Sequence, residues 1–250
     1  EILERWDADL DIWVSEPDRC QAHALNKGFA KAGGEIFGWL CADDELAPGA
    51  LRRIGRLFAE RADVDVITAG CQRDFNEGAN RVQTTPDARY YERLDFMNTI
   101  EQPSTFWRAA SHRAAGKLDE TYRYAFDWEF WCRLKRVGAR FHAIDDILSV
   151  YYFSDDNLTS SGGQKIADEM YRVIKTYGPY QGRIADVYRF LFRTFDMRGY
   201  YDADTREQIP KWKRGFFYGV LRALYVPFDR ETVNSYNWNF ASRQERGLGW

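Results

Sequence analysis

Two mostly apolar segments constrain the fold of this chain more than any other feature. They are EIFGWLC at residues 35–41 and VDVITAG at residues 64–70, and each has the length and composition of a buried β-strand. Between them, Pro48 and Gly49 precede the segment ALRRIGRLFAER, which has the pattern of an amphipathic helix. The order strand, helix, strand predicts an α/β fold, and we expect the first strand to be buried on both faces of a parallel sheet.

The flanking segments extend this pattern. A short strand is expected at about Asp11 to Val14, followed by a helix that Asp18 and Gln21 would start as a capping-box-like pair. Residues 71–91 are expected to form a hairpin or a loop. Downstream, the patterns predict a strand and a short helix over residues 102–120, an amphipathic helix over 126–138 and a strand over 140–153.

The length of 250 residues allows one large domain or a domain with an appendage. Residues 154–164 are rich in Ser, Asp and Gly, and the pattern beyond them is helical to about Tyr225. We therefore expect an α/β domain at residues 1–160 and a helical C-terminal extension at residues 161–250. The chain starts without a Met, and its first residues read like the middle of a domain.

Composition argues against several classes of protein. The formal net charge of −3 gives no indication of nucleic-acid binding, and the four Cys, without a CxxC pair, indicate neither a zinc site nor a disulfide scaffold. The sequence contains no signal-peptide pattern and no apolar run of the roughly 20 residues that span a membrane. A cytoplasmic location is therefore expected.

Two adjacent acidic residues, Asp43 and Asp44, come just after the first apolar segment. Ligands of α/β sheets bind beyond the carboxyl ends of the strands, and Mg²⁺ or Mn²⁺ prefers oxygen ligands such as carboxylates. The pair could therefore anchor a metal ion and a diphosphate. Alternatively, Asp44 and Glu45 only favour the start of the helix after Pro48, as acidic residues do near helix N-termini.

Three separated motifs occur together in this chain: SEPDRCQAHALNKGFAKAGGEIFGWLCADDELAPGAL, then QPSTFWR, then FDWEFWCRL. In this order they resemble the inverting family 2 glycosyltransferases of GT-A fold. The resemblance covers roughly Ile12 to Thr159. Members of that family open with a strand, helix and strand that have no counterpart here, so we expect this domain to lack its N-terminal strands.

The resemblance implies a role for several residues of the metal and donor site. Asp43 matches the last acidic residue of the family's Asp-x-Asp motif and would be the ligand of Mg²⁺ or Mn²⁺, with Asp44 beside it as a substrate contact. Cys41 stands where many members have the first Asp of the motif. Asp18, Asn26 and Lys27 fall in the segment that lines the nucleotide pocket of the family.

The same resemblance assigns the acceptor side. Asp127 matches the catalytic base, although the residue alone reads more simply as the N-cap of its helix. Gln102 matches an acceptor-side loop. Trp128 would stack on a sugar, with core packing as the alternative, and Glu129 would contact the acceptor unless it pairs with Arg133 at i+4. The family often has a metal-binding His near the positions of Ser154 and Asp155.

The C-terminal extension has a distinct surface character. From Arg206 to Trp250 there are eight Lys/Arg and four Asp/Glu, and the segment IPKWKRGFFYGVLRALYVPF mixes basic and aromatic residues. That composition suits an interfacial helix on an anionic membrane, and it suits equally a helix packed on the α/β domain. Contact with the inner face of the membrane would fit a lipid-linked acceptor.

The resemblance to family 2 implies a glycosyltransferase that moves a sugar from a nucleotide-diphosphate donor to a glycan or lipid-linked acceptor with inversion and with help from a metal ion. Two alternatives stay open. One is a non-catalytic module that binds a glycan or a protein. The other is a metal-dependent phosphoesterase, which would need a second acid near Asp43 to activate water.

Overall fold

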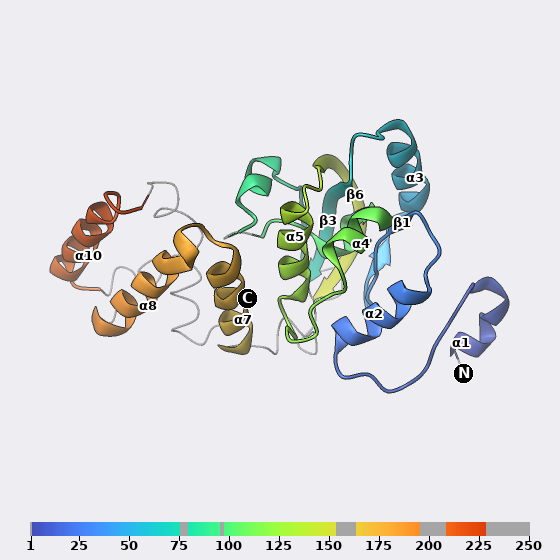
Figure 1. Cartoon of the computed structure of the whole chain (residues 1–250), viewed down its shortest axis with the longest axis horizontal. Coiled ribbons are helices and arrows are strands. Elements are labelled where there is room, and N and C mark those ends of the chain that lie inside the picture. Colours follow the sequence, from blue (N-terminus) through green and yellow to red (C-terminus); the bar gives the residue numbers. More distant parts are fainter. Residues whose placement is uncertain (1, 76–79, 96–97, 154–163, 196–208, 229–250) are drawn as a thin grey trace.

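The strand predicted at residues 64–70 lies at the centre of the sheet and is longer than expected. The structure is a computed structural model that describes residues 2–75, 80–95, 98–153, 164–195 and 209–228. In it, β3 (Val66–Phe75) is buried over its first six residues, because its apolar side chains are covered on both faces. The mixed α/β architecture expected from the sequence is confirmed (Figure 1).

Strand β3 pairs on both sides within one mixed sheet. Its parallel neighbour is β6 (Phe141–Phe153), and its antiparallel neighbours are β5 (Thr105–Arg108) and β4 (Asn80–Thr84). The path through the sheet is β1-β5-β3-β6-β2, where β1 is Ile36–Phe37 and β2 is Glu45–Leu46. The pairing of β3 with β4 is the hairpin that the sequence allowed for residues 71–91.

The first predicted strand is corrected by the structure. Only Ile36 and Phe37 join the sheet, and they pair antiparallel with β5 instead of lying between two parallel strands. Beyond them, a side chain at Gly38 would come within 2.7 Å of Phe106. The apolar run continues because Trp39 packs into an aromatic cluster, where its ring stacks on Trp131 at a centroid distance of 5.7 Å.

The N-terminal predictions also need correction. Residues 11–14 form no strand, and short helical turns precede them as α1 (Ile2–Arg5) and η1 (Asp7–Asp9). Helix α2 (Gln21–Lys31) starts two residues later than predicted, with Cys20 as its N-cap and no side-chain cap. Asp18 is therefore not the capping residue.

The helices around the sheet follow the predicted pattern. Helix α3 (Ala50–Glu60) begins after Gly49, which has a positive φ of 81° that suits a residue without a Cβ. Helix α4 (Ala109–Ala115) follows β5 directly. The predicted helix at residues 126–138 is α5 (Phe126–Arg136), most of which is buried. Short 3₁₀ turns are η2 (Ala88–Arg93) and η3 (Gln102–Ser104).

The C-terminal helices are α7 (Gln164–Tyr177), η4 (Pro179–Gly182), α8 (Arg183–Phe195) and α10 (Lys211–Ala223). Helix α7 packs beside α5, and its Val173 and Ile174 are buried in the same core as the aromatic cluster (Figure 1). Helices α8 and α10 extend away from the sheet, on the side opposite α1 (Figure 1). The predicted boundary near residue 160 lies outside the described residues, as do Ser154 and Asp155, so both interpretations stay predictions.

Candidate active site

A cavity of about 540 Å³ opens where the loop after β1 meets the start of α5. We call it the central cavity. Its walls come from segments far apart in the chain and include Gln21, Cys41, Asp43, Arg73, Glu101, Gln102, Asp127, Trp128, Tyr151, Ile166 and Met170. Asp43 and Asp127, to which the resemblance to family 2 assigns the metal site and the catalytic base, both line it.

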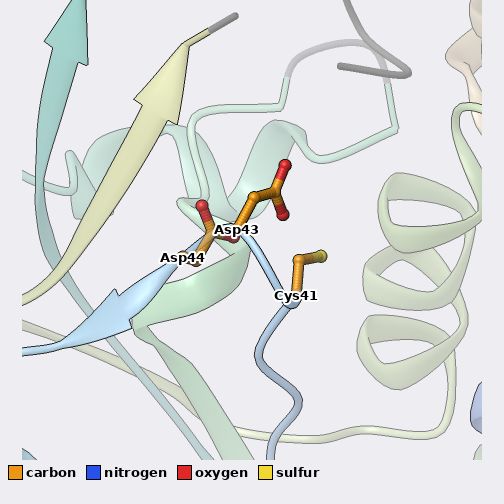
Figure 2. A group of neighbouring side chains, drawn as sticks. All are labelled: Cys41, Asp43 and Asp44. Carbon is orange, nitrogen blue, oxygen red and sulfur yellow. The ribbon is translucent and has the colours of Figure 1, made fainter. Parts of the chain in front are cut away.

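The acidic loop holds three potential ligands close together. Residues 38–44 leave β1, turn at Ala42 and Asp43, and lead into β2. One ligand atom from each of Cys41, Asp43 and Asp44 lies within 4.8 Å of the others (Figure 2). Asp43 is exposed on the cavity wall, whereas Asp44 is 7% exposed.

Asp44 is a buried carboxyl group whose two oxygens accept no hydrogen bond of normal geometry from the described residues. Burial, together with the nearby charge of Asp43, raises its pKa to about 7. Burial also raises the pKa of the Cys41 thiol to about 11, so the sulfur keeps its proton. Two adjacent carboxyl groups fit a hard divalent cation, and a protonated thiol adds little to such a site.

Asp127 lies in the first turn of α5 and is partly buried against the cavity. Its Oδ1 accepts the backbone N–H of Trp128 at 2.7 Å. The residue is not the N-cap, because Ala125 occupies that position and has no side-chain acceptor. The alternative interpretation of Asp127 as an N-cap is thereby corrected.

The environment of Asp127 suits a group that accepts a proton. Burial raises the pKa of its carboxyl group to about 6, and the nearby carboxylates of Glu101 and Glu169 act in the same direction. The N–H group of Trp128 opposes this shift but does not cancel it. A carboxyl group with a pKa near 6 is ionised at neutral pH and is a stronger base than an ordinary Asp.

Two further predicted contacts line the central cavity. The side-chain amide of Gln102 donates to the carbonyl oxygen of Trp39 at 2.8 Å, which fixes it at the cavity wall. Trp128 is 1% exposed, and its indole N–H donates to the carbonyl oxygen of Leu94. Such burial makes Trp128 mainly a packing residue at the cavity floor.

Glu129 and Asn26 are placed differently from the prediction. Glu129 is 3% exposed, pairs with Arg133 at 2.8 Å and accepts from the Tyr177 hydroxyl, so the predicted i+4 pairing is confirmed and the acceptor contact is not. Asn26 is 6% exposed and bonds both the N–H and the C=O of Leu118. A side chain that is saturated by backbone partners in the core has a structural role.

Asp18 and Lys27 line a second cavity of about 850 Å³, between α2 and residues 9–16. The Lys27 ammonium donates to the carbonyl oxygen of Pro17 at 2.7 Å and pairs with Glu16 at 2.9 Å. Neither residue lines the central cavity, to which α2 contributes Gln21. The prediction that Asp18 and Lys27 contact the nucleotide is left as a prediction.

Sequence reasoning missed part of the central cavity. Arg73 on β3 lines it and pairs with Glu101 at 2.7 Å, and α7 contributes Ile166 and Met170. The side chains of α7 were assigned to a separate extension. The apolar spacing of Ile166, Met170 and Val173 was the signal that this helix has a face packed on the core.

Comparisons with known proteins concern the family and the fold of this chain. Residues 2–117 match the family model of Glycosyl transferase family 2. Crystal structures of S. aureus TarS 1-349 resemble the fold: one covers 84% of this chain and 64% of its own, with 17% identity and a TM-score of 0.50. The complex of TarS 1-349 with UDP-GlcNAc covers 98% and 78%, with 16% identity and a TM-score of 0.54. No curated protein matches the chain.

The fold is therefore that of the GT-A glycosyltransferases. Residues 2–117, slightly less than half of the chain, match the model of glycosyl transferase family 2, and the resemblance drawn from the three sequence motifs is confirmed to this extent. The chain spans 64% of the length of the first TarS structure, and at this level of identity the likeness concerns the fold. Within the described part of the chain, no helix has both the length and the hydropathy needed to cross a bilayer.

Proposed function

We propose that this chain transfers a sugar from a UDP-linked donor to the hydroxyl group of a glycan or lipid-linked acceptor, with inversion at the anomeric carbon. The observation that carries the proposal is the central cavity, in which Asp43 and Asp127 face one space from two separate elements. A nucleotide-sugar reaction needs one acidic site for the diphosphate and another for the acceptor proton. The match to family 2 and the UDP-GlcNAc complex of TarS support the choice of donor class.

On the donor side, Asp43 and Asp44 are the residues that would hold a divalent cation. Bound there, Mg²⁺ or Mn²⁺ would neutralise the diphosphate leaving group. Asp43 presents its carboxylate on the cavity wall, and Asp44 adds a buried carboxyl group beside it. Arg73 also lines the cavity and supplies a positive charge that Glu101 holds in place.

On the acceptor side, Asp127 takes the proton of the attacking hydroxyl group. The hydrogen bond from Trp128 N–H fixes one of its oxygens. Its raised pKa keeps it basic while leaving it ionised at neutral pH. The aromatic side chains of Tyr151 and Phe153 line the same cavity and offer surfaces on which an acceptor sugar can stack.

The C-terminal helix α10 has a surface that suits binding to a membrane. Helix α10 exposes Trp212, Phe216 and Tyr218, and basic residues such as Lys211 and Lys213 flank them. We propose that this helix binds the anionic inner face of a membrane from the cytoplasmic side, which would bring a lipid-linked acceptor near the domain.

The test is donor-dependent release of nucleoside diphosphate. The purified chain is incubated with UDP-GlcNAc and other UDP-sugars, with Mg²⁺ or Mn²⁺, in the presence of candidate acceptors, and the anomeric configuration of the product is determined by NMR. Release of UDP with an inverted glycosidic bond supports the proposal. Glycan binding without turnover supports a non-catalytic module instead, and retention of configuration contradicts the role of Asp127.

A further inference from the structure

The carboxylate of Glu169, on helix α7, contacts the turn that precedes α5. Glu169 accepts hydrogen bonds from three consecutive backbone N–H groups, those of Arg123, Tyr124 and Ala125, at 2.8, 2.7 and 3.0 Å. These groups form the turn immediately before α5, two residues from Asp127 at its nearest point. The bond partners are 44 to 46 residues apart in the chain, so this contact is tertiary.

The turn needs an external acceptor because its own sequence supplies none. The N-cap of α5 is Ala125, which has no side-chain oxygen and is a poor capping residue. Three N–H groups that point in a similar direction make a site that favours an anion, and a carboxylate is a strong acceptor for such groups. Glu169 therefore binds the N–H groups of the three residues that lead into the helix, including that of the N-cap residue Ala125 itself.

The helix that carries Glu169, α7, is anchored in the core. On the same helix, Ile166 is 3% exposed and Val173 is fully buried, and Ile166 and Met170 line the central cavity. These residues fix α7 against the core and so anchor the part of the backbone that carries Glu169. On the other side of the turn, the bond from Trp128 N–H holds the Asp127 carboxylate to the helix backbone.

We propose that Glu169 is a positioning residue for the transfer reaction: it fixes the turn of residues 123–125 and thereby sets the direction of the Asp127 carboxylate into the central cavity. This inference rests on the proposed role of Asp127 as the base. It makes α7 part of the catalytic unit of this chain, although the helix lies beyond the segment that matches family 2. A displacement of about 1 Å of a catalytic group lowers turnover by as much as 100-fold.

The experiment compares Glu169→Ala, Glu169→Gln and the control Asp168→Asn. Asp168 is the neighbouring carboxylate on α7, and it pairs with Arg189 on α8 instead of the turn. We expect Glu169→Ala to lower kcat about 10- to 100-fold with little change in the KM of the donor. Glu169→Gln keeps one acceptor oxygen and should recover part of kcat, whereas Asp168→Asn should behave as wild type.

Two further measurements separate positioning from general stability. Amide hydrogen exchange should lose protection at residues 123–125 in Glu169→Ala while the β3 and β6 amides stay protected. The acidic limb of the kcat profile should move to lower pH, because Glu169, like Glu101, is a negative charge that faces Asp127. Wild-type kcat in a folded Glu169→Ala variant would overturn the proposal.

The outcomes also distinguish this inference from the proposed function. If the wild-type chain releases no nucleoside diphosphate, the proposed function fails and the catalytic role of Glu169 fails with it. Amide exchange then still decides whether Glu169 holds the turn. Unchanged protection at residues 123–125 in both Glu169 variants overturns the inference whatever the activity.

Discussion

Replacement of Asp127 by Asn should separate activity from stability. Asn has nearly the same size as Asp, and its Oδ1 can accept the Trp128 N–H at the same 2.7 Å. It cannot take a proton from an acceptor hydroxyl group. General-base catalysis typically contributes 10²- to 10⁴-fold, so kcat should fall by about that range while the affinity for the donor stays near its wild-type value.

The effect on stability follows from the raised pKa. A shift of the carboxyl pKa from 3.8 to about 6 means that ionised Asp127 costs the folded state up to about 3 kcal/mol. The folded chain holds this proton more tightly than the unfolded chain, so wild-type stability falls as the pH rises from about 4 to about 6. The Asn variant lacks this loss, and above about pH 6 it should be as stable as wild type or more so.

The assay follows three quantities across pH: kcat/KM for UDP release, donor affinity, and the free energy of unfolding in urea. Wild-type kcat/KM should fall below about pH 6, as Asp127 becomes protonated, and the residual activity of the variant should lack this limb. Near-normal turnover by Asp127→Asn would refute the assignment of the base. So would a loss of activity that merely tracks unfolding, since the role of Asp127 would then be structural.

Three other predictions follow from the same structure. Asp43→Asn should weaken donor affinity and metal dependence first, as isothermal titration with UDP and Mn²⁺ would show; unchanged metal dependence would remove Asp43 from the site. Glu129→Gln should lower the free energy of unfolding by about 3 kcal/mol, because it leaves Arg133 as a mostly buried charge, and wild-type stability in urea would contradict the structural role. Residues 206–228 should give the chain a salt-sensitive affinity for anionic vesicles, and equal sedimentation with neutral vesicles would count against it.

Sequence patterns predicted the helices and strands whose formation depends on neighbouring residues within one segment. The spacing of apolar residues identified α3, α5 and β6, since amphipathic periodicity is determined within each segment. Asp43 and Asp127 could be assigned to one cavity before the structure was known, because the resemblance to family 2 gives both a role in the reaction and ligands of α/β sheets bind beyond the carboxyl ends of the strands.

The features that sequence patterns did not predict have a different physical origin. They depend on contacts between segments that are distant in the chain. The segment EIFGWLC was read as a central strand, but its partner is β5 alone and its remaining apolar residues fill an aromatic cluster. Asn26 was read as a substrate contact, but the backbone of Leu118 occupies its side chain. Glu169 gave no signal in the sequence, because its partners are backbone N–H groups, which every residue except Pro carries.

Helix α5 shows how one short segment can carry two carboxylates with opposite roles. Asp127 and Glu129 are two residues apart, which places their side chains about 200° apart around the helix. Glu129 points into the core, where Arg133, one turn later, neutralises it. The residue one turn after Asp127 is Trp131, which offers no charge, so the Asp127 carboxylate has no cation at i+4 to lower its basicity. An acidic residue in the first turn without a basic residue at i+4 is therefore the better candidate for the base, and this criterion can be read from the sequence FDWEFWCR.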